Sequence, residues 1–107
     1  MPRVRFQTLT EQMYYILMCL RRECCGMDIM DRIPAMTGGR VRVGSGTLYN
    51  LLEQFLSAGM IAETKVEGRK RSYLITEAGR AALAEEYRRL RLLAADYEHC
   101  MGEGETP

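Results

Sequence analysis

The sequence has no long hydrophobic run, and nowhere does it approach the roughly 18 uninterrupted apolar residues that a membrane-spanning helix needs. Its first residues, MPRVRFQTLTEQ, also lack the apolar core of a secretory signal. These absences argue against a membrane protein, and we expect a cytoplasmic chain with no membrane partner. The four cysteines are then expected to stay mostly reduced.

The residue patterns of enzymes and metal sites are also missing. The single histidine, His99, stands apart from any serine–histidine–acid order, and Gly44-Ser-Gly46 is too short for a phosphate-binding loop. We therefore expect no catalysis, no cofactor and no bound metal. No Cys-x-x-Cys spacing occurs, which favours free, buried or half-buried thiols. A thiol or soft-metal sensor is the alternative for Cys19, Cys24, Cys25 and Cys100.

Net charge is scarce too, at +1 for 107 residues, but it is unevenly placed. Residues 1–75 hold 11 Lys or Arg against 7 Asp or Glu, whereas residues 76–107 hold 4 against 7. This asymmetry predicts a basic body that faces an anion, followed by an acidic helical tail. A single domain of this length buries a modest core, which it often completes against a second copy of itself.

Three short helices are predicted in the first half. Thr10 is a good N-cap for a helix from about 11 to 22, and a second helix spans about 26 to 36. Pro34 should kink or end the second helix near Ile33. The third helix has Ser45 as a plausible N-cap and ends at Gly59. Its apolar stripe consists of Leu48, Leu51, Leu52, Phe55 and Leu56.

A hairpin and a long helix follow. Residues 60–66 and 71–75 are typical of two strands joined by the polar turn Glu67-Gly-Arg-Lys70, and Thr76 caps the last helix. Apolar residues then recur in that helix at spacings of four, three, four, three and four, which indicates a heptad seam for dimerisation. The seam is Leu83, Tyr87, Leu90, Ala94, Tyr97 and Met101.

Three helices followed by a hairpin with a basic tip are the order of a winged helix-turn-helix. We expect a mainly α (α+β) fold with three parts. Residues 1–75 form the DNA-binding domain with a basic N-terminal arm that carries Arg3 and Arg5. Residues 76–101 form the dimerisation helix, and residues 102–107 form a frayed tail.

The third helix and the wing divide the work of DNA binding in this interpretation. The helix offers neutral polar side chains for base edges, while cations around it attract phosphates. Arg40 and Arg42 lead into the helix, and Glu53 in its middle is unexplained: it reads a cytosine amino group or points into solvent. The candidate DNA-binding residues are Arg42, Ser45, Thr47, Tyr49, Asn50, Gln54, Lys65, Arg69, Lys70 and Arg71.

The segments TGGRVRVGSG (37–46), GTLYNLL (46–52), AGMI (58–61) and EGRKRSYLITEAGRAAL (67–83) resemble the PadR family of transcriptional regulators. The resemblance covers nearly the whole chain. It implies a homodimeric winged-helix repressor on a palindromic operator, in which the last helix packs against the first helix of the partner. Many relatives carry a basic residue near Glu53 and Gln54, and many have Tyr at the position of Met27. The first departure shifts phosphate binding to the helix N-terminus and the wing.

The resemblance further implies a small hydrophobic or phenolic effector near the dimer interface. The walls that we expect for that site are Tyr14, Met18, Leu90, Ala94 and Tyr97. Two alternatives stay open: a winged-helix protein-interaction module without DNA binding, for which Glu53 is the best argument, and a small-molecule carrier. The operator, the regulated genes and the effector are not encoded in any pattern that we recognise.

Overall fold

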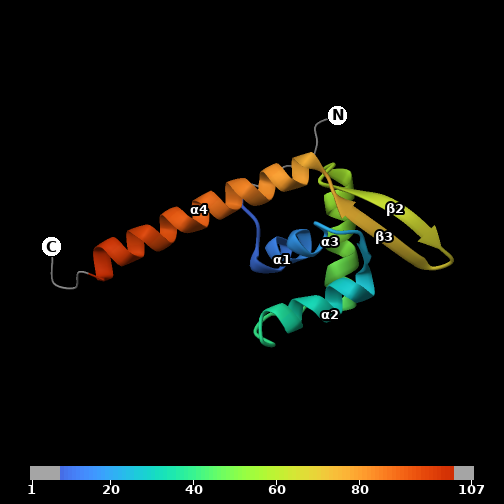
Figure 1. Cartoon of the computed structure of the whole chain (residues 1–107), viewed down its shortest axis with the longest axis horizontal. Coiled ribbons are helices and arrows are strands. Elements are labelled where there is room, and N and C mark those ends of the chain that lie inside the picture. Colours follow the sequence, from blue (N-terminus) through green and yellow to red (C-terminus); the bar gives the residue numbers. More distant parts are fainter. Residues whose placement is uncertain (1–7, 103–107) are drawn as a thin grey trace.

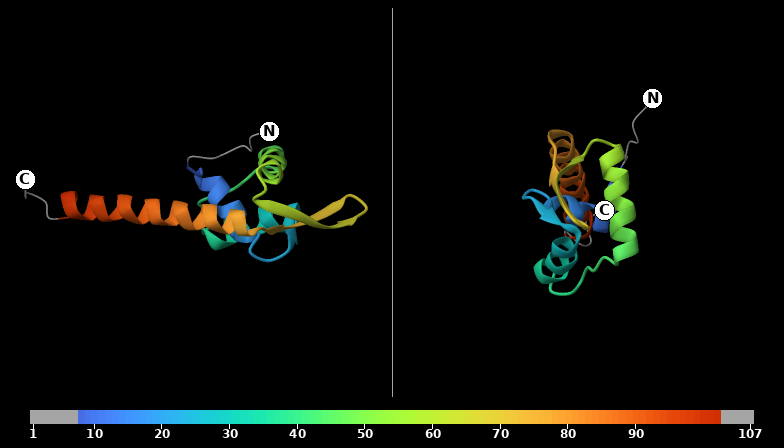
Figure 2. Two further views of the ribbon diagram at one scale, coloured as in Figure 1. Left: turned by 90° about the horizontal axis from the view of Figure 1, so that it is seen from above. Right: turned by 90° about the vertical axis from the view of Figure 1, so that its right-hand side faces the viewer.

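The computed structural model describes residues 8–102. The elements follow in the order α1 (Glu11–Cys19), β1 (Cys24–Cys25), α2 (Gly26–Met36), α3 (Ser45–Ser57), β2 (Ile61–Glu67), β3 (Lys70–Ile75) and α4 (Glu77–Met101). The first three helices and the sheet form a body from which α4 extends as a long rod (Figure 1, Figure 2). The predicted winged helix-turn-helix with a long C-terminal helix is confirmed. Arg3, Arg5 and residues 103–107 of the expected tail lie outside the described residues.

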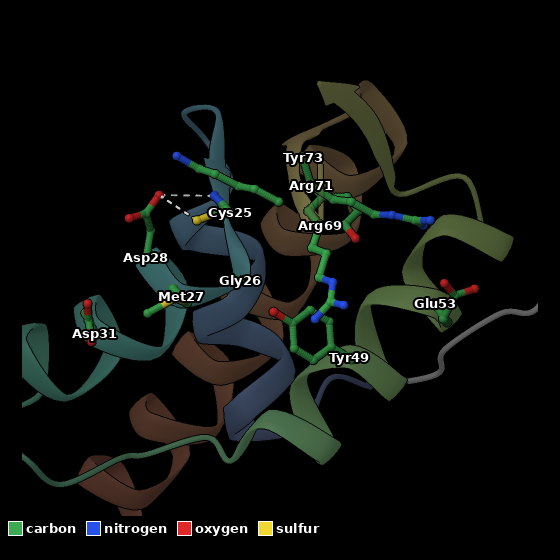
Figure 3. A pocket seen from close by; sticks show the side chains of 11 residues that line it. Cys25, Gly26, Met27, Asp28, Asp31, Tyr49, Glu53, Arg69, Arg71 and Tyr73 are labelled. Carbon is green, nitrogen blue, oxygen red and sulfur yellow. Dashed lines mark hydrogen bonds between the residues drawn. The ribbon is translucent and has the colours of Figure 1, made fainter. Parts of the chain in front are cut away.

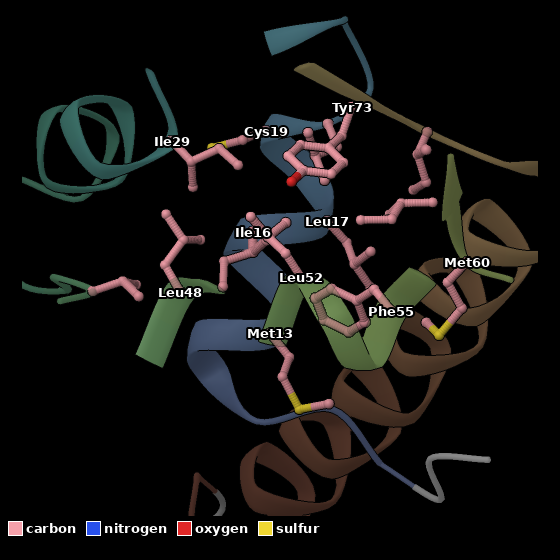
Figure 4. Close-up of a cluster of buried hydrophobic side chains, with 14 of the residues drawn as sticks. Met13, Ile16, Leu17, Cys19, Ile29, Leu48, Leu52, Phe55, Met60 and Tyr73 are labelled. Carbon is pink, nitrogen blue, oxygen red and sulfur yellow. The ribbon is translucent and has the colours of Figure 1, made fainter. Parts of the chain in front are cut away.

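One hydrophobic cluster joins the three helices of the body (Figure 4). Burying a large aliphatic or aromatic side chain contributes about 1.5–3 kcal/mol, so this cluster dominates the stability of the body. Of the predicted stripe on α3, Leu51 and Leu56 are only partly buried. The largest fully buried side chains are Ile16, Leu17 and Leu20 at the end of α1, Ile29 and Ile33 of α2, and Leu48, Leu52 and Phe55 of α3.

The sheet has three antiparallel strands in the order β1-β3-β2. The predicted hairpin of β2 and β3 is confirmed within one residue at each end, with Gly68 in the left-handed region at its tip (φ 63°). The short strand β1 was not predicted: Cys24 pairs with Tyr73 and Cys25 with Ser72. A strand of two residues is too short to show an alternating pattern.

One helix end differs from the expectation, whereas α2 has the expected bounds in spite of its proline. α1 ends at Cys19 rather than near residue 22, because the Leu20 carbonyl accepts a hydrogen bond from the Ile75 N–H of β3 (2.8 Å). α2 does not end at Ile33 but continues through Pro34 to Met36. Proline lacks only its own N–H, and the carbonyls of Ile33 and Pro34 still accept from the Thr37 N–H (3.1 and 3.3 Å).

The helix caps agree with the sequence at all but one position. Thr10 and Thr76 cap α1 and α4 by accepting from the N–H groups three residues later, and Gly59 follows α3 with a φ of 74°. Ser45, however, is the first helical residue rather than the N-cap. The N-cap is Gly44, because its carbonyl already accepts the first helical hydrogen bond from the Leu48 N–H (2.9 Å).

A buried carboxylate ties α4 to the segment before α1. Glu86 is 4% exposed, and its Oε1 accepts from the Leu9 N–H (3.2 Å) and from Arg89 Nε (3.3 Å). Its other oxygen pairs with Arg89 Nη2. The hydrogen bond from Arg89, supported by that from Leu9, holds the pKa of Glu86 below its ordinary value in spite of burial. The sequence did not reveal this contact, since a glutamate in an amphipathic helix is expected to face water.

This contact predicts a pH dependence. Because the pKa of Glu86 is lower in the folded chain than in the unfolded one, its stabilising contribution is present above the ordinary pKa of about 4.5 and is lost as the pH falls through the folded value. We expect Glu86→Gln to lose less stability than the wild type between pH 6 and pH 3, as measured by urea unfolding. The matched control is Glu85→Gln, which removes an exposed partner of Arg88 and should follow the wild type. Equal pH curves for the wild type and both variants would contradict the assignment.

Candidate nucleic-acid interface

The outer face of α3 carries the uncharged side chains that the sequence predicted. Leu48, Leu52 and Phe55 point into the core, and this orientation leaves the opposite side of the helix to solvent. Tyr49 is 46% exposed, and Gln54 is half-buried. Glu53 is exposed on the same helix, so it is a surface carboxylate rather than part of the core. The remaining candidates on α3, all exposed, are Ser45, Thr47 and Asn50.

The wing supplies cations, but two of them face carboxylates. Lys65 lies 3.8 Å from Glu67, and Arg71 lies 3.5 Å from Glu63, so their charges are partly compensated within the hairpin. Arg69 and Lys70 form no ion pair among the described residues, and both are exposed. The freest positive charge of the wing is therefore at its tip.

Of the two basic residues before α3, one forms an ion pair with a carboxylate and the other does not. Arg40 Nη1 forms an ion pair with Glu11 (3.0 Å), and its Nη2 donates to the Tyr15 hydroxyl (3.1 Å). Arg42 has no ion pair in the described part of the chain, and its backbone carbonyl accepts from Gln12 Nε2 (3.0 Å). Arg42, in the segment before α3, thus keeps a guanidinium without an ion pair, while that of Arg40 is held by α1.

A groove of about 690 Å³ separates the wing from the start of α2 and the outer face of α3 (Figure 3). It brings together Tyr49, Arg69, Lys70 and Arg71 from the predicted set. The other predicted DNA-binding residues do not line it. The remaining residues of the lining do not belong to the predicted DNA-binding set. They are Cys25, Gly26, Met27, Asp28, Asp31, Glu53 and Tyr73.

The Tyr49 ring lies directly on Gly26. A Cβ placed on Gly26 would stand 2.6 Å from the Tyr49 hydroxyl oxygen and 2.9 Å from Cζ, closer than atoms can pack. Only glycine leaves room for the ring at the first residue of α2. The contact joins the N-terminal turns of α2 and α3, so Tyr49 positions the two helices relative to each other in addition to lining the groove.

Asp28 places a fixed negative charge on the α2 side of the groove. Its Oδ2 accepts from the Cys25 N–H (3.1 Å) and from Cys25 Sγ (3.3 Å), which caps the start of α2. These hydrogen bonds, with further help from Arg32 and Lys70, hold the pKa of Asp28 below its ordinary value. The groove is therefore bipolar, with cations on the wing and carboxylates on the helices.

The cysteines are four free thiols, of which Cys100 is exposed and the others are buried. Burial raises the pKa of Cys24 to about 11, so that its thiol stays protonated near neutral pH. In residues 8–102, no group of three or more His, Cys, Asp or Glu side chains is placed to hold a metal ion. The arrangement favours structural thiols over the sensor alternative.

The predicted heptad seam runs along the part of α4 that leaves the body. Leu83 is half-buried, and the other five seam residues are exposed, with Tyr97 at 67% and Met101 at 63%. Leu92 and Leu93 are exposed as well, although they were not predicted to belong to the seam. None of the other described elements covers the outer half of the helix (Figure 2).

The expected effector walls do not line either of two grooves that residues 8–102 form, and their prediction involves a second chain. Tyr14 lies near Tyr87 and Glu86 of its own α4; burial raises the pKa of Tyr14, and these two neighbours add to the rise. Farther along α4 lie Leu90, Ala94 and Tyr97. The helix rises about 1.5 Å for each residue beyond Tyr87. Neither the groove beside the wing nor the smaller groove described below is lined by any of the five residues.

Together, the helical core, the exposed face of α3 and the basic hairpin define a winged helix-turn-helix protein with a long C-terminal helix. A family model described as the transcriptional regulator PadR-like family matches residues 16–85. The chain therefore belongs to the PadR-like family of transcriptional regulators. No protein of curated function matches the sequence. The family is one of regulators rather than enzymes, and no helix of the described residues is long and apolar enough to cross a membrane.

Solved structures share the fold at low sequence identity. A transcriptional regulator from Clostridium thermocellum, Cth-833, has a TM-score of 0.74 and 21% identity, with 82% of this chain and 90% of that chain covered. A PadR-like transcription factor from Bacteroides fragilis has a TM-score of 0.67 and 24% identity, with 80% and 85% covered. RosR from H. salinarum has a TM-score of 0.63 and 20% identity, with 89% and 98% covered.

The Tyr49–Gly26 contact predicts a coupling between two substitutions. Gly26→Ala should destabilise the wild type by about 1 kcal/mol or more, because the new methyl group overlaps the ring. In a Tyr49→Ala background the same change should be neutral or stabilising, since alanine favours a helix and the overlap is gone. Urea unfolding of the four proteins measures the coupling. The same cost of Gly26→Ala in both backgrounds would show that the ring does not depend on this glycine.

Proposed function

We propose that this chain is a cytoplasmic transcriptional repressor that binds palindromic operator DNA as a homodimer, through α3 and the wing. The observation that carries the proposal is the groove in which Tyr49 of α3 meets Arg69 and Lys70 of the wing tip. It places one exposed polar side chain of α3, that of Tyr49, beside cations suited to phosphates. The membership in a family of regulators supports the same role.

The distribution of charge supports a division of labour along the interface. Exposed Asn50 and half-buried Gln54 carry amides that pair with adenine in the major groove. The unpaired cations Arg42, Arg69 and Lys70 flank α3 on both sides and attract the phosphates. Ser45, Thr47 and the backbone amides of the first turn of α3 add contacts without charge. Lys65 and Arg71 contribute less until DNA draws them away from Glu67 and Glu63.

A second copy of the chain is the partner that α4 requires. Its seam residues from Tyr87 to Met101 expose an apolar row that a monomer would leave in water. Pairing of two such helices buries the row and sets the two recognition helices apart on a palindrome. The same pairing would bring Tyr14 and Met18 of one chain toward Leu90, Ala94 and Tyr97 of the other. A small hydrophobic or phenolic effector between them would then change the spacing and relieve repression.

The alternative is a winged-helix interaction module that does not bind DNA. Three carboxylates in the groove favour it, because Asp28, Asp31 and Glu53 repel phosphates. The two functions differ in their salt dependence on random-sequence duplexes, since DNA binding releases counterions. Affinity that does not change with salt, or none at all, supports the interaction module.

Replacing the wing tip tests the repressor function. Arg69→Ala with Lys70→Ala should weaken binding to every duplex and lower the slope of log K against log salt by about 0.9 for each lost phosphate contact. The comparison variant Asn50→Ala should instead change the preference among sequences and leave the slope as it is, because it removes no charge. Fluorescence anisotropy over a salt series measures both. An unaltered slope after loss of both wing cations would remove the wing from the interface.

The dimer seam is tested by charges on opposite sides of α4. Leu90→Glu or Tyr97→Glu should give monomers in sedimentation velocity, because a carboxylate in the buried seam is costly to desolvate. Leu92→Glu is the matched control: Leu92 is 65% exposed and lies about 200° around the helix from Leu90, so its charge should leave the dimer intact. Dimers that survive both seam variants would disprove the interface.

A further inference from the structure

Three arginines gather at the corner between α1 and α2, away from the residues assigned above. Arg21 and Arg22 follow the end of α1, and Arg32 projects from α2. With Cys19, Ala35 and Met36 they line a groove of about 490 Å³. Its lining contains three guanidinium groups and no carboxylate.

No ion pair within residues 8–102 compensates the positive charge of this corner, although Arg32 stabilises the Asp28 anion from beyond ion-pair distance. Elsewhere Arg40, Arg71, Arg88 and Arg89 each face a carboxylate within 4 Å. Among the residues that the structure describes, none of the three corner arginines forms such a pair. Arg21 is held only by the Met18 carbonyl, which accepts from its Nη1 (3.1 Å). Three like charges around one groove repel one another unless an anion enters.

The guanidinium groups lie close to the buried end of the groove. Burial raises the pKa of the Cys19 thiol, and Arg32 and Arg21 both oppose that rise. Arg32 opposes the same effect of burial at Cys24. The positive field of the arginines therefore reaches the buried thiols at the end of α1 and in β1, rather than spreading only into solvent.

Asp28, in the first turn of α2, feels cations from both the wing and the corner. Asp28, which lines the groove beside the wing, is stabilised as an anion by Lys70 from the wing and by Arg32 from the corner. The carboxylate of Asp28 thus separates two groups of cations, one at the wing tip and one at the corner. Arginine suits phosphate better than other anions at such a site, because its planar fork donates two parallel hydrogen bonds to phosphate oxygens.

We propose that Arg21, Arg22 and Arg32 form a phosphate-binding site. The phosphate comes from one of two sources. It is a backbone phosphate of the bound DNA, in which case this inference rests on the proposed function and extends its interface beyond α3 and the wing. Otherwise it is a free phosphate-bearing small molecule, whose binding does not depend on DNA.

The test compares two triple variants. Replacing all three arginines with glutamine removes the charge and keeps a polar side chain, and replacing them with lysine keeps the charge as the matched control. The single variant Arg32→Gln is the fallback if the triple glutamine variant unfolds. The first measurement is the thermal unfolding midpoint in sodium phosphate and sodium pyrophosphate, against sodium chloride at the same ionic strength. A ligand that binds only the folded state raises this midpoint.

The second measurement is the salt slope on a random-sequence duplex. If DNA is the source, the glutamine variant should lower the slope by about 0.9 for each lost contact, and the lysine variant should not. If a small molecule is the source, phosphate or pyrophosphate should raise the midpoint of the wild type and the lysine variant but not of the glutamine variant, with equal slopes. No midpoint shift in the wild type together with unchanged slopes overturns the proposal. Failure of the proposed function would be recognised by a different result, because the wing variant Arg69→Ala with Lys70→Ala would then leave the salt slope of DNA binding unchanged.

Discussion

The hydrophobic cluster that α3 shares with α1 and α2 is the constraint on which the rest of the molecule depends. Because Leu48, Leu52 and Phe55 are committed to the core, the opposite side of α3 has to face outward. The antiparallel pairing of β3 with β1 then holds the hairpin beside the start of α2, so that the wing and the exposed face of α3 border one groove. The position of the groove therefore follows from the packing of the core and the pairing of the strands.

Patterns with a clear period were sufficient to predict most of the fold. The stripe on α3 and the seam on α4 are long enough for helical spacing to appear, and Thr10, Thr76 and Gly59 mark their helix ends by local chemistry. Features set by distant partners were missed. The strand β1 exists only because β3 lies beside it, and the end of α1 depends on a hydrogen bond from Ile75.

The candidate site shows the same limit. The sequence predicted side chains suited to contact DNA, since their chemistry is local to α3 and the wing, and their contacts with DNA remain a prediction. It did not find Gly26 beneath Tyr49, Asp28 in the groove or Glu86 under Leu9, because each acquires its role from a residue at least 20 positions away or from a tertiary surface. The ion pairs of Lys65 and Arg71 were not predicted from the sequence either, although they decide which cations of the wing lack an ion pair.

Charge placement gives the molecule a consistent physical logic. The ion pair of Arg40 with Glu11 joins the segment before α3 to α1. Among the described residues, cations without an ion pair lie at the wing tip, before α3, at the corner of α1 and α2, and on α4 at Arg80 and Arg91. The carboxylates in the groove beside the wing repel phosphate groups, so the attraction for a polyanion comes from the cations at the edges of that groove. The proposed interface would hold DNA at its edges and keep its centre neutral or repulsive, which would penalise any duplex that does not fit the groove. A weak net charge is therefore compatible with selective DNA binding, because selectivity depends on where charges are uncompensated rather than on their sum.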